Sequence, residues 1–143
     1  MALALPPALK AMVDELNTVD DLTDKYEILI ELGAKVPDIP AEDKVPANLV
    51  HGCQSVVHIA ASLQDGKLAF RGHADAMVVN GLLALLVLGL SGLRPEEFLV
   101  FPPDFIKETG IIKTLTPSRV NGFYNIHHRM HLLAEGLKNG GAA

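Results

Sequence analysis

The chain has 143 residues, of which 49% are apolar and 20% charged, and its formal net charge is −5. This length and composition are typical of a soluble globular protein, and we expect a single domain over residues 1–143 with its core in residues 7–138. The acidic balance, with no block of lysine and arginine to follow a phosphate backbone, argues against a nucleic acid as partner.

The first two predicted elements are helices. Apolar residues recur at helical spacing over 7–16 and again over about 22–34. Asp20 or Asp21 is placed to cap the second helix, because a carboxylate accepts hydrogen bonds from the free N–H groups of a first turn. Gly33 lies near the end of this helix, where we expect a residue with positive φ.

The next segment predicts a hairpin. Three prolines make residues 36–47 an extended loop, and Asp65-Gly66 is a two-residue hairpin turn. We place strands at about 54–63 and 67–73, with a third short strand near 48–50. One register puts the apolar side chains of the two main strands on the same face, namely Val57, Ile59, Ala61, Leu63, Leu68 and Phe70.

The rest of the chain is predicted to be mainly helical. Asp75 is placed to cap a helix over about 76–90, which is apolar almost all round and should be buried centrally. Residues 94–97 start a short helix, and Thr116-Pro117 starts the last one, which runs to about residue 137. The sequence therefore predicts an α+β fold, in which helices pack around a small antiparallel sheet of about three strands.

Cys53 is the only cysteine, so the chain cannot form an internal disulfide, and a reducing compartment is expected. The residue has two interpretations. It is either a small buried hydrophobe or a reactive thiol on a loop, and Gly52 before it favours a sharp loop that another molecule can approach. The N-terminus is not typical of a signal peptide, and the apolar stretch at 82–90 is far shorter than the ~20 residues that span a bilayer. We therefore expect no membrane association and a cytoplasmic location, or a plastid if a transit peptide has been removed.

Three segments in order resemble the SufE family of sulfur acceptors. Residues 48–57 contain its Gly-Cys-Gln-Ser loop and the strand after it, residues 75–82 are similar to the start of its buried helix, and residues 115–122 contain a Leu-Thr-Pro-Ser-Arg signature. The chain departs from the pattern at His58, where the family often has tryptophan, and at Ala74, where it often has serine. The departures leave the acceptor cysteine untouched but concern strand packing and partner choice.

The resemblance implies a fold and a function. The fold would be the SufE- and IscU-like arrangement of helices on a small sheet. The protein would accept persulfide sulfur from a SufS- or CsdA-like cysteine desulfurase onto Cys53, stimulate that enzyme, and pass the sulfur to an iron–sulfur scaffold. It would bind no cofactor or metal of its own, and it would be an accessory protein rather than a stand-alone enzyme. A single cysteine fits a carrier better than a cluster scaffold, which needs several thiolate ligands.

Unperturbed cysteine is only a few per cent thiolate at neutral pH, so a nearby cation would help. Arg119 is the first candidate, because it stands in a matching motif near a helix N-terminus, and His51 is the second. A structural salt bridge for Arg119 and a solvated loop residue for His51 are equally good interpretations. The residues expected to support the loop are Gly52, Gln54, Ser55 and Asp75.

Other functions stay open. A binding module or adaptor would dock the same partner without carrying sulfur. Less favoured is a cysteine hydrolase built from Cys53, His73 and Asp75, because the required geometry cannot be judged from spacing. His127 and His131 have the spacing of a helical metal pair, but an exposed polar helix face is the preferred interpretation.

Overall fold

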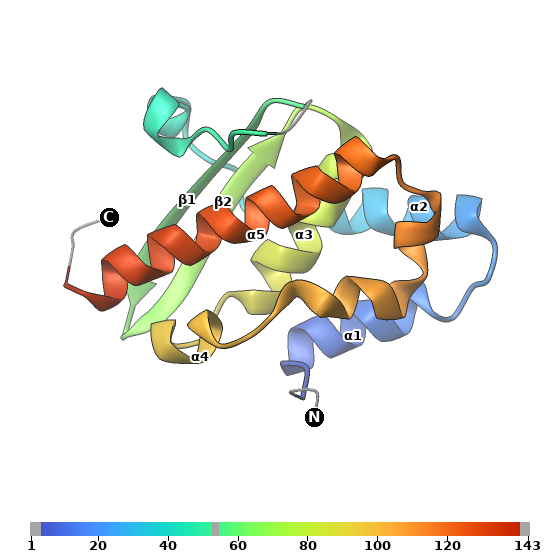
Figure 1. Ribbon diagram of the computed structural model, residues 1–143, viewed down its shortest axis with the longest axis horizontal. Coiled ribbons are helices and arrows are strands. Elements are labelled where there is room, and N and C mark those ends of the chain that lie inside the picture. Colours follow the sequence, from blue (N-terminus) through green and yellow to red (C-terminus); the bar gives the residue numbers. More distant parts are fainter. Residues whose placement is uncertain (1–3, 53–54, 141–143) are drawn as a thin grey trace.

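The computed structural model describes residues 4–52 and 55–140 and packs helices around one antiparallel hairpin (Figure 1). Over the described residues, no helix has the length and apolarity needed to cross a bilayer. In chain order the main elements are α1 Pro7–Leu16, α2 Leu22–Gly33, β1 Val57–Gln64, β2 Lys67–Ala74, α3 Met77–Leu90, α4 Pro95–Leu99 and α5 Pro117–Lys138. Short 3-10 turns join them at Ala41–Asp43, Pro46–Asn48, Pro103–Thr109 and Ile111–Thr114.

The two N-terminal helices are confirmed, and the cap of α2 is Asp21. Its carboxylate accepts hydrogen bonds from the backbone N–H groups of Thr23 (2.8 Å) and Asp24 (3.2 Å). The positive φ predicted at Gly33 is wrong. Gly33 is instead a point of close approach to α3, because a Cβ there would lie 3.0 Å from the backbone nitrogen of Gly81.

The hairpin is confirmed in its predicted register, with Leu63 opposite Leu68. Asp65 and Gly66 both have positive φ, as a tight two-residue turn requires. Within the described residues the sheet has two strands, so the third strand predicted near 48–50 is wrong. Leu49 forms only an isolated bridge with β1, because the 3-10 turn Pro46–Asn48 lies directly before it and Gly52, at φ +85°, turns the chain soon after.

Helix α3 occupies the centre of the molecule as predicted. Ten of its fourteen residues are buried, and it packs against α1, α2 and β2. Asp75 does not cap it. Ala76 is the N-cap residue and has an extended backbone, so the helix begins one residue later than the cap position of Asp75 requires. The Asp75 carboxylate instead accepts a hydrogen bond from the backbone N–H of Val56, at 3.0 Å.

Helix α5 runs the length of the hairpin and packs on β1, α3 and α4 (Figure 1). Its predicted start is confirmed, because the Thr116 hydroxyl accepts a hydrogen bond from the backbone N–H of Arg119 at 3.3 Å. This cap fixes the direction of the first turn, which carries the Leu-Thr-Pro-Ser-Arg segment toward the start of α3. The α5 residues buried in the core are Gly122, Phe123, Ile126, His127, Met130, Ala134 and Leu137.

The crossing of α2 and α3 depends on Gly81. A Cβ at this position would lie 2.5 Å from the backbone oxygen of Leu29, a distance that forces the helices apart. Overpacking costs about 1–3 kcal/mol, and the better helix propensity of alanine returns at most about 1 kcal/mol. We therefore expect Gly81→Ala to lower the free energy of unfolding by about 1–2 kcal/mol in urea titrations. Gly136→Ala on α5 is the matched control, because a Cβ there meets no atom within 4 Å and should stabilise the protein slightly. Equal effects of the two substitutions would contradict this account.

Candidate functional site

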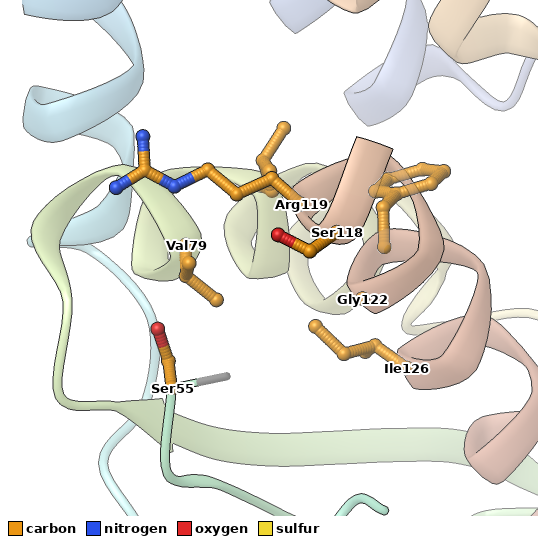
Figure 2. A pocket seen from close by; sticks show the side chains of 8 residues that line it. Ser55, Val79, Ser118, Arg119, Gly122 and Ile126 are labelled. Atoms are coloured by element: carbon orange, nitrogen blue, oxygen red, sulfur yellow. The ribbon is translucent and has the colours of Figure 1, made fainter. Parts of the chain in front are cut away.

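A small cavity lies where the chain entering β1 meets α3 and the first turns of α5 (Figure 2). Figure 2 shows Ser55 on one side, residues of α5 on the other, and Val79 of α3 between them. Its volume is about 60 Å³, well below the 300–1,000 Å³ of typical small-molecule sites. The cavity therefore accommodates a group of a few atoms rather than a metabolite. The lining residues are Ser55, Val79, Leu82, Ser118, Arg119, Gly122, Phe123 and Ile126.

Arg119 is the only charged residue among those described residues that line the cavity. Its backbone N–H is used by the Thr116 cap, while its exposed side chain extends from α5 across the top of the view in Figure 2. Within residues 4–52 and 55–140, Arg119 forms no ion pair, so the structural salt bridge considered as its alternative role does not form there. Together with the hydroxyls of Ser55 and Ser118, it makes this rim suitable for a small anionic group.

Cys53 and Gln54 lie outside the described residues, but the chain on both sides of them is anchored. On the N-terminal side, the Asn125 side-chain amide donates a hydrogen bond to the backbone oxygen of Gly52 at 3.0 Å. On the C-terminal side, Val56 and Asp75 exchange two hydrogen bonds. The Val56 N–H donates to the Asp75 carboxylate at 3.0 Å, and the Asp75 N–H donates to the Val56 oxygen at 3.2 Å.

The predicted site residues are therefore found in different roles. Ser55 and Arg119 line the same cavity although they are far apart in sequence, and Gly52 and Asp75 belong to the two anchors. His51 is exposed on the approaching loop and does not line the cavity. Sequence reasoning missed Asn125, because a polar residue beside the core position Ile126 carries no local sign of a partner in a distant loop.

The prediction of an exposed polar face for the α5 histidines is wrong at His127. This residue is only 9% exposed, its ring packs against Phe98 with centroids 5.6 Å apart, and it is hydrogen-bonded to the backbone of Phe101. Burial in this apolar setting lowers the pKa of His127 to about 4. His131 instead faces Glu135, with 3.5 Å between Nδ1 and Oε1. Among residues 4–52 and 55–140, no three His, Cys, Asp or Glu side chains gather as a metal site would require.

Comparison with known proteins decides the family. The family model described as "SufE: Fe-S metabolism associated domain" matches residues 10–134. The chain belongs to the SufE family. This SufE chain is 45% identical over 136 residues to an uncharacterized SufE-like protein of Synechocystis sp., covering 95% of this chain and 86% of that protein. It is 34% identical over 142 residues to the cysteine desulfuration protein SufE of Plasmodium falciparum, covering 94% of this chain but 57% of that longer protein.

The fold agrees with this assignment. The solution structure of a hypothetical protein from Thermus thermophilus superimposes with a TM-score of 0.78 and 29% sequence identity, covering 92% of this SufE chain and 96% of that chain. The α+β class predicted from the sequence is thereby confirmed, with two strands in place of about three.

Proposed function

We propose that this SufE chain accepts one sulfur atom as a persulfide on Cys53 from a cysteine desulfurase, stimulates that enzyme, and passes the sulfur to an iron–sulfur assembly scaffold. One observation carries the proposal. In a chain of the SufE family, the single cysteine belongs to a Gly-Cys-Gln-Ser segment whose Ser55 lines a cavity together with Arg119, and the chain is anchored at Gly52 and at Val56. A SufE relative is named a cysteine desulfuration protein, which supports a desulfurase as the partner.

The chemistry is an exchange at sulfur. The Cys53 thiolate attacks the outer sulfur of the desulfurase persulfide and forms a new S–S bond with it. The S–S bond inside the desulfurase persulfide breaks, and the enzyme's cysteine leaves as a thiolate. The step consumes one thiolate and releases another, so it needs no external oxidant or reductant. A thiol that must stay reduced supports a reducing compartment, such as the cytoplasm or a plastid interior.

The size of the small cavity suits the group that the proposal assigns to it. A volume of about 60 Å³ suits a thiolate or persulfide rather than a prosthetic group. If sulfur is held at this rim, the Arg119 guanidinium favours its anionic form, because a nearby cation stabilises a thiolate. Ser55, two residues after Cys53 in the chain, lines the same cavity as Arg119, which supports Arg119 as the cation that acts on the thiol.

Replacing Arg119 by alanine should slow sulfur acceptance without unfolding the protein. Because the side chain is exposed, its electrostatic effect on a thiolate is worth about 1 kcal/mol, which corresponds to about a fivefold loss of rate. We expect the same loss in the rate at which iodoacetamide alkylates Cys53 at pH 7. Arg119→Lys retains the charge and should keep most of the reactivity. If iodoacetamide alkylates Cys53 in Arg119→Ala as fast as in wild type, Arg119 does not activate the thiol.

The proposal as a whole is tested by desulfurase turnover. A cysteine desulfurase is supplied with cysteine and a reductant, and alanine formation is measured with and without an excess of the chain. We expect faster alanine formation with the chain, because Cys53 clears the enzyme persulfide between turnovers. No stimulation by desulfurases of the SufS or CsdA type would count against the proposal.

A further inference from the structure

Two side chains on one face of α5 hold the segment that leads to Cys53. Asn125 donates to the backbone oxygen of Gly52 at 3.0 Å, and the Arg129 guanidinium donates to the backbone oxygen of Ala47. The two residues are four positions apart, so they project from the same side of the helix. Side chains of α5 thus form hydrogen bonds with both ends of the segment 47–52.

The other side of this segment is fixed to the sheet. The Val50 N–H donates to the backbone oxygen of Val57 at 2.8 Å, and Leu49 forms an isolated bridge with His58. Residues 47–52 therefore lie between β1 and the side chains of α5. The contacts with β1 reach only as far as Val50 along the segment, so they do not fix Gly52. The hydrogen bond from Asn125 holds Gly52 itself.

Gly52 is fitted closely to Asn125. It has φ +85°, and a Cβ added to it would lie 2.3 Å from the Asn125 amide nitrogen. The position therefore demands glycine twice, once for backbone conformation and once for space. Such close contact makes the direction of the chain at Gly52, immediately before Cys53, depend on the Asn125 amide.

We propose that Asn125 is a positioning residue for sulfur transfer, acting through Gly52 to orient the chain that enters Cys53. Arg129 is the second α5 side chain that holds residues 47–52, through its hydrogen bond to Ala47. The proposal rests on the proposed sulfur-acceptor function. Transfer between two cysteines requires their sulfur atoms to meet at bonding distance. If the chain before Cys53 is less restrained, a smaller fraction of encounters with the desulfurase leads to transfer. We therefore expect a substitution of Asn125 to change the rate of sulfur transfer and to leave the affinity for the desulfurase unchanged.

The test compares Asn125→Asp with wild type. Aspartate keeps the size of the side chain but cannot donate to the Gly52 oxygen. With the SufE chain at a concentration that saturates the desulfurase, we expect Asn125→Asp to lower the rate of persulfide transfer about fivefold. The apparent dissociation constant between the two proteins should stay unchanged. Arg129→Met, acting further from Cys53, should cause a smaller loss. Asn17→Asp is the matched control, because Asn17 also donates its amide to a backbone oxygen, that of Glu108 at 3.0 Å, far from the loop.

A double-substitution cycle separates positioning from general loosening. Gly52→Ala should slow transfer more in the wild-type background than in Asn125→Ala, where the clash is absent and only the φ strain remains. Hydrogen exchange of the Val50 amide supplies a readout that needs no desulfurase, and it should accelerate in Asn125→Asp but not in Asn17→Asp.

The outcomes distinguish this inference from the proposed function. If wild type accepts sulfur and Asn125→Asp transfers it at least as fast, or if the two Gly52→Ala effects are equal, the positioning role is wrong. If wild type accepts no sulfur, the proposed function fails, and the transfer role of Asn125 fails with it. If the Val50 amide exchanges at the same rate in Asn125→Asp as in wild type, Asn125 does not hold residues 47–52 in place, whatever the transfer rates are.

Discussion

Cys53→Ser is expected to abolish sulfur acceptance while leaving the fold and desulfurase binding intact. Serine has nearly the same size, but its hydroxyl is un-ionised at neutral pH and forms no persulfide. The chain has no second cysteine to replace it. We therefore expect stimulation of alanine formation to disappear, with circular dichroism and the affinity for the desulfurase unchanged.

The same variant separates the alternative functions. An adaptor that acts by docking alone would keep stimulating the desulfurase when Cys53 is serine. A cysteine hydrolase would show burst acylation of wild type by an activated ester, which a sulfur carrier does not require. Retained stimulation in Cys53→Ser would contradict the sulfur-carrier account directly.

The second large effect is a loss of stability in acid that originates at His127. The pKa of this residue is about 4 in the folded protein and about 6.5 in the unfolded chain, so between these pH values the unfolded state binds the proton more tightly. The contribution is therefore fully present above pH 6.5 and is lost as the pH falls toward 4. A shift of this size corresponds to at most about 3 kcal/mol.

The measurement is urea unfolding at several pH values for wild type and His127→Phe. Phenylalanine cannot take up a proton, so the difference between the two proteins should change by up to about 3 kcal/mol between pH 6.5 and 4. His128→Gln is the control, because His128 is exposed on the same helix and should leave the wild-type pH dependence in place. Parallel curves for wild type and His127→Phe would exclude His127 as the source.

Local patterns predicted the elements that depend on local rules. The hairpin register followed from the Asp65-Gly66 turn, because alternation permits only one pairing that places the apolar side chains together. The start of α5 followed from Thr116-Pro117, since a hydroxyl cap and a residue without an N–H both suit a first turn. Family motifs rather than periodicity singled out the Cys53 segment, whose role stays a prediction.

The features that sequence reasoning missed depend on tertiary contacts. Asn125 and Gly52 are 73 residues apart, and nothing near either residue reports the other. Asp75 is a residue type that often caps helices, but Ala76 has an extended backbone and is itself the N-cap residue. The Asp75 carboxylate instead accepts a hydrogen bond from the Val56 N–H. His127 was assigned to solvent because helical periodicity gives the centre of a buried face but not its width, which here is set by Phe98 and α4.

The central claim is tested most directly by intact mass. The chain is incubated with a cysteine desulfurase and cysteine, then measured before and after treatment with a reductant. A species heavier by one sulfur atom, removed by the reductant and missing from Cys53→Ser, is the result we predict. An unmodified wild-type chain, under conditions in which the desulfurase itself carries persulfide, would contradict the claim that this protein receives sulfur.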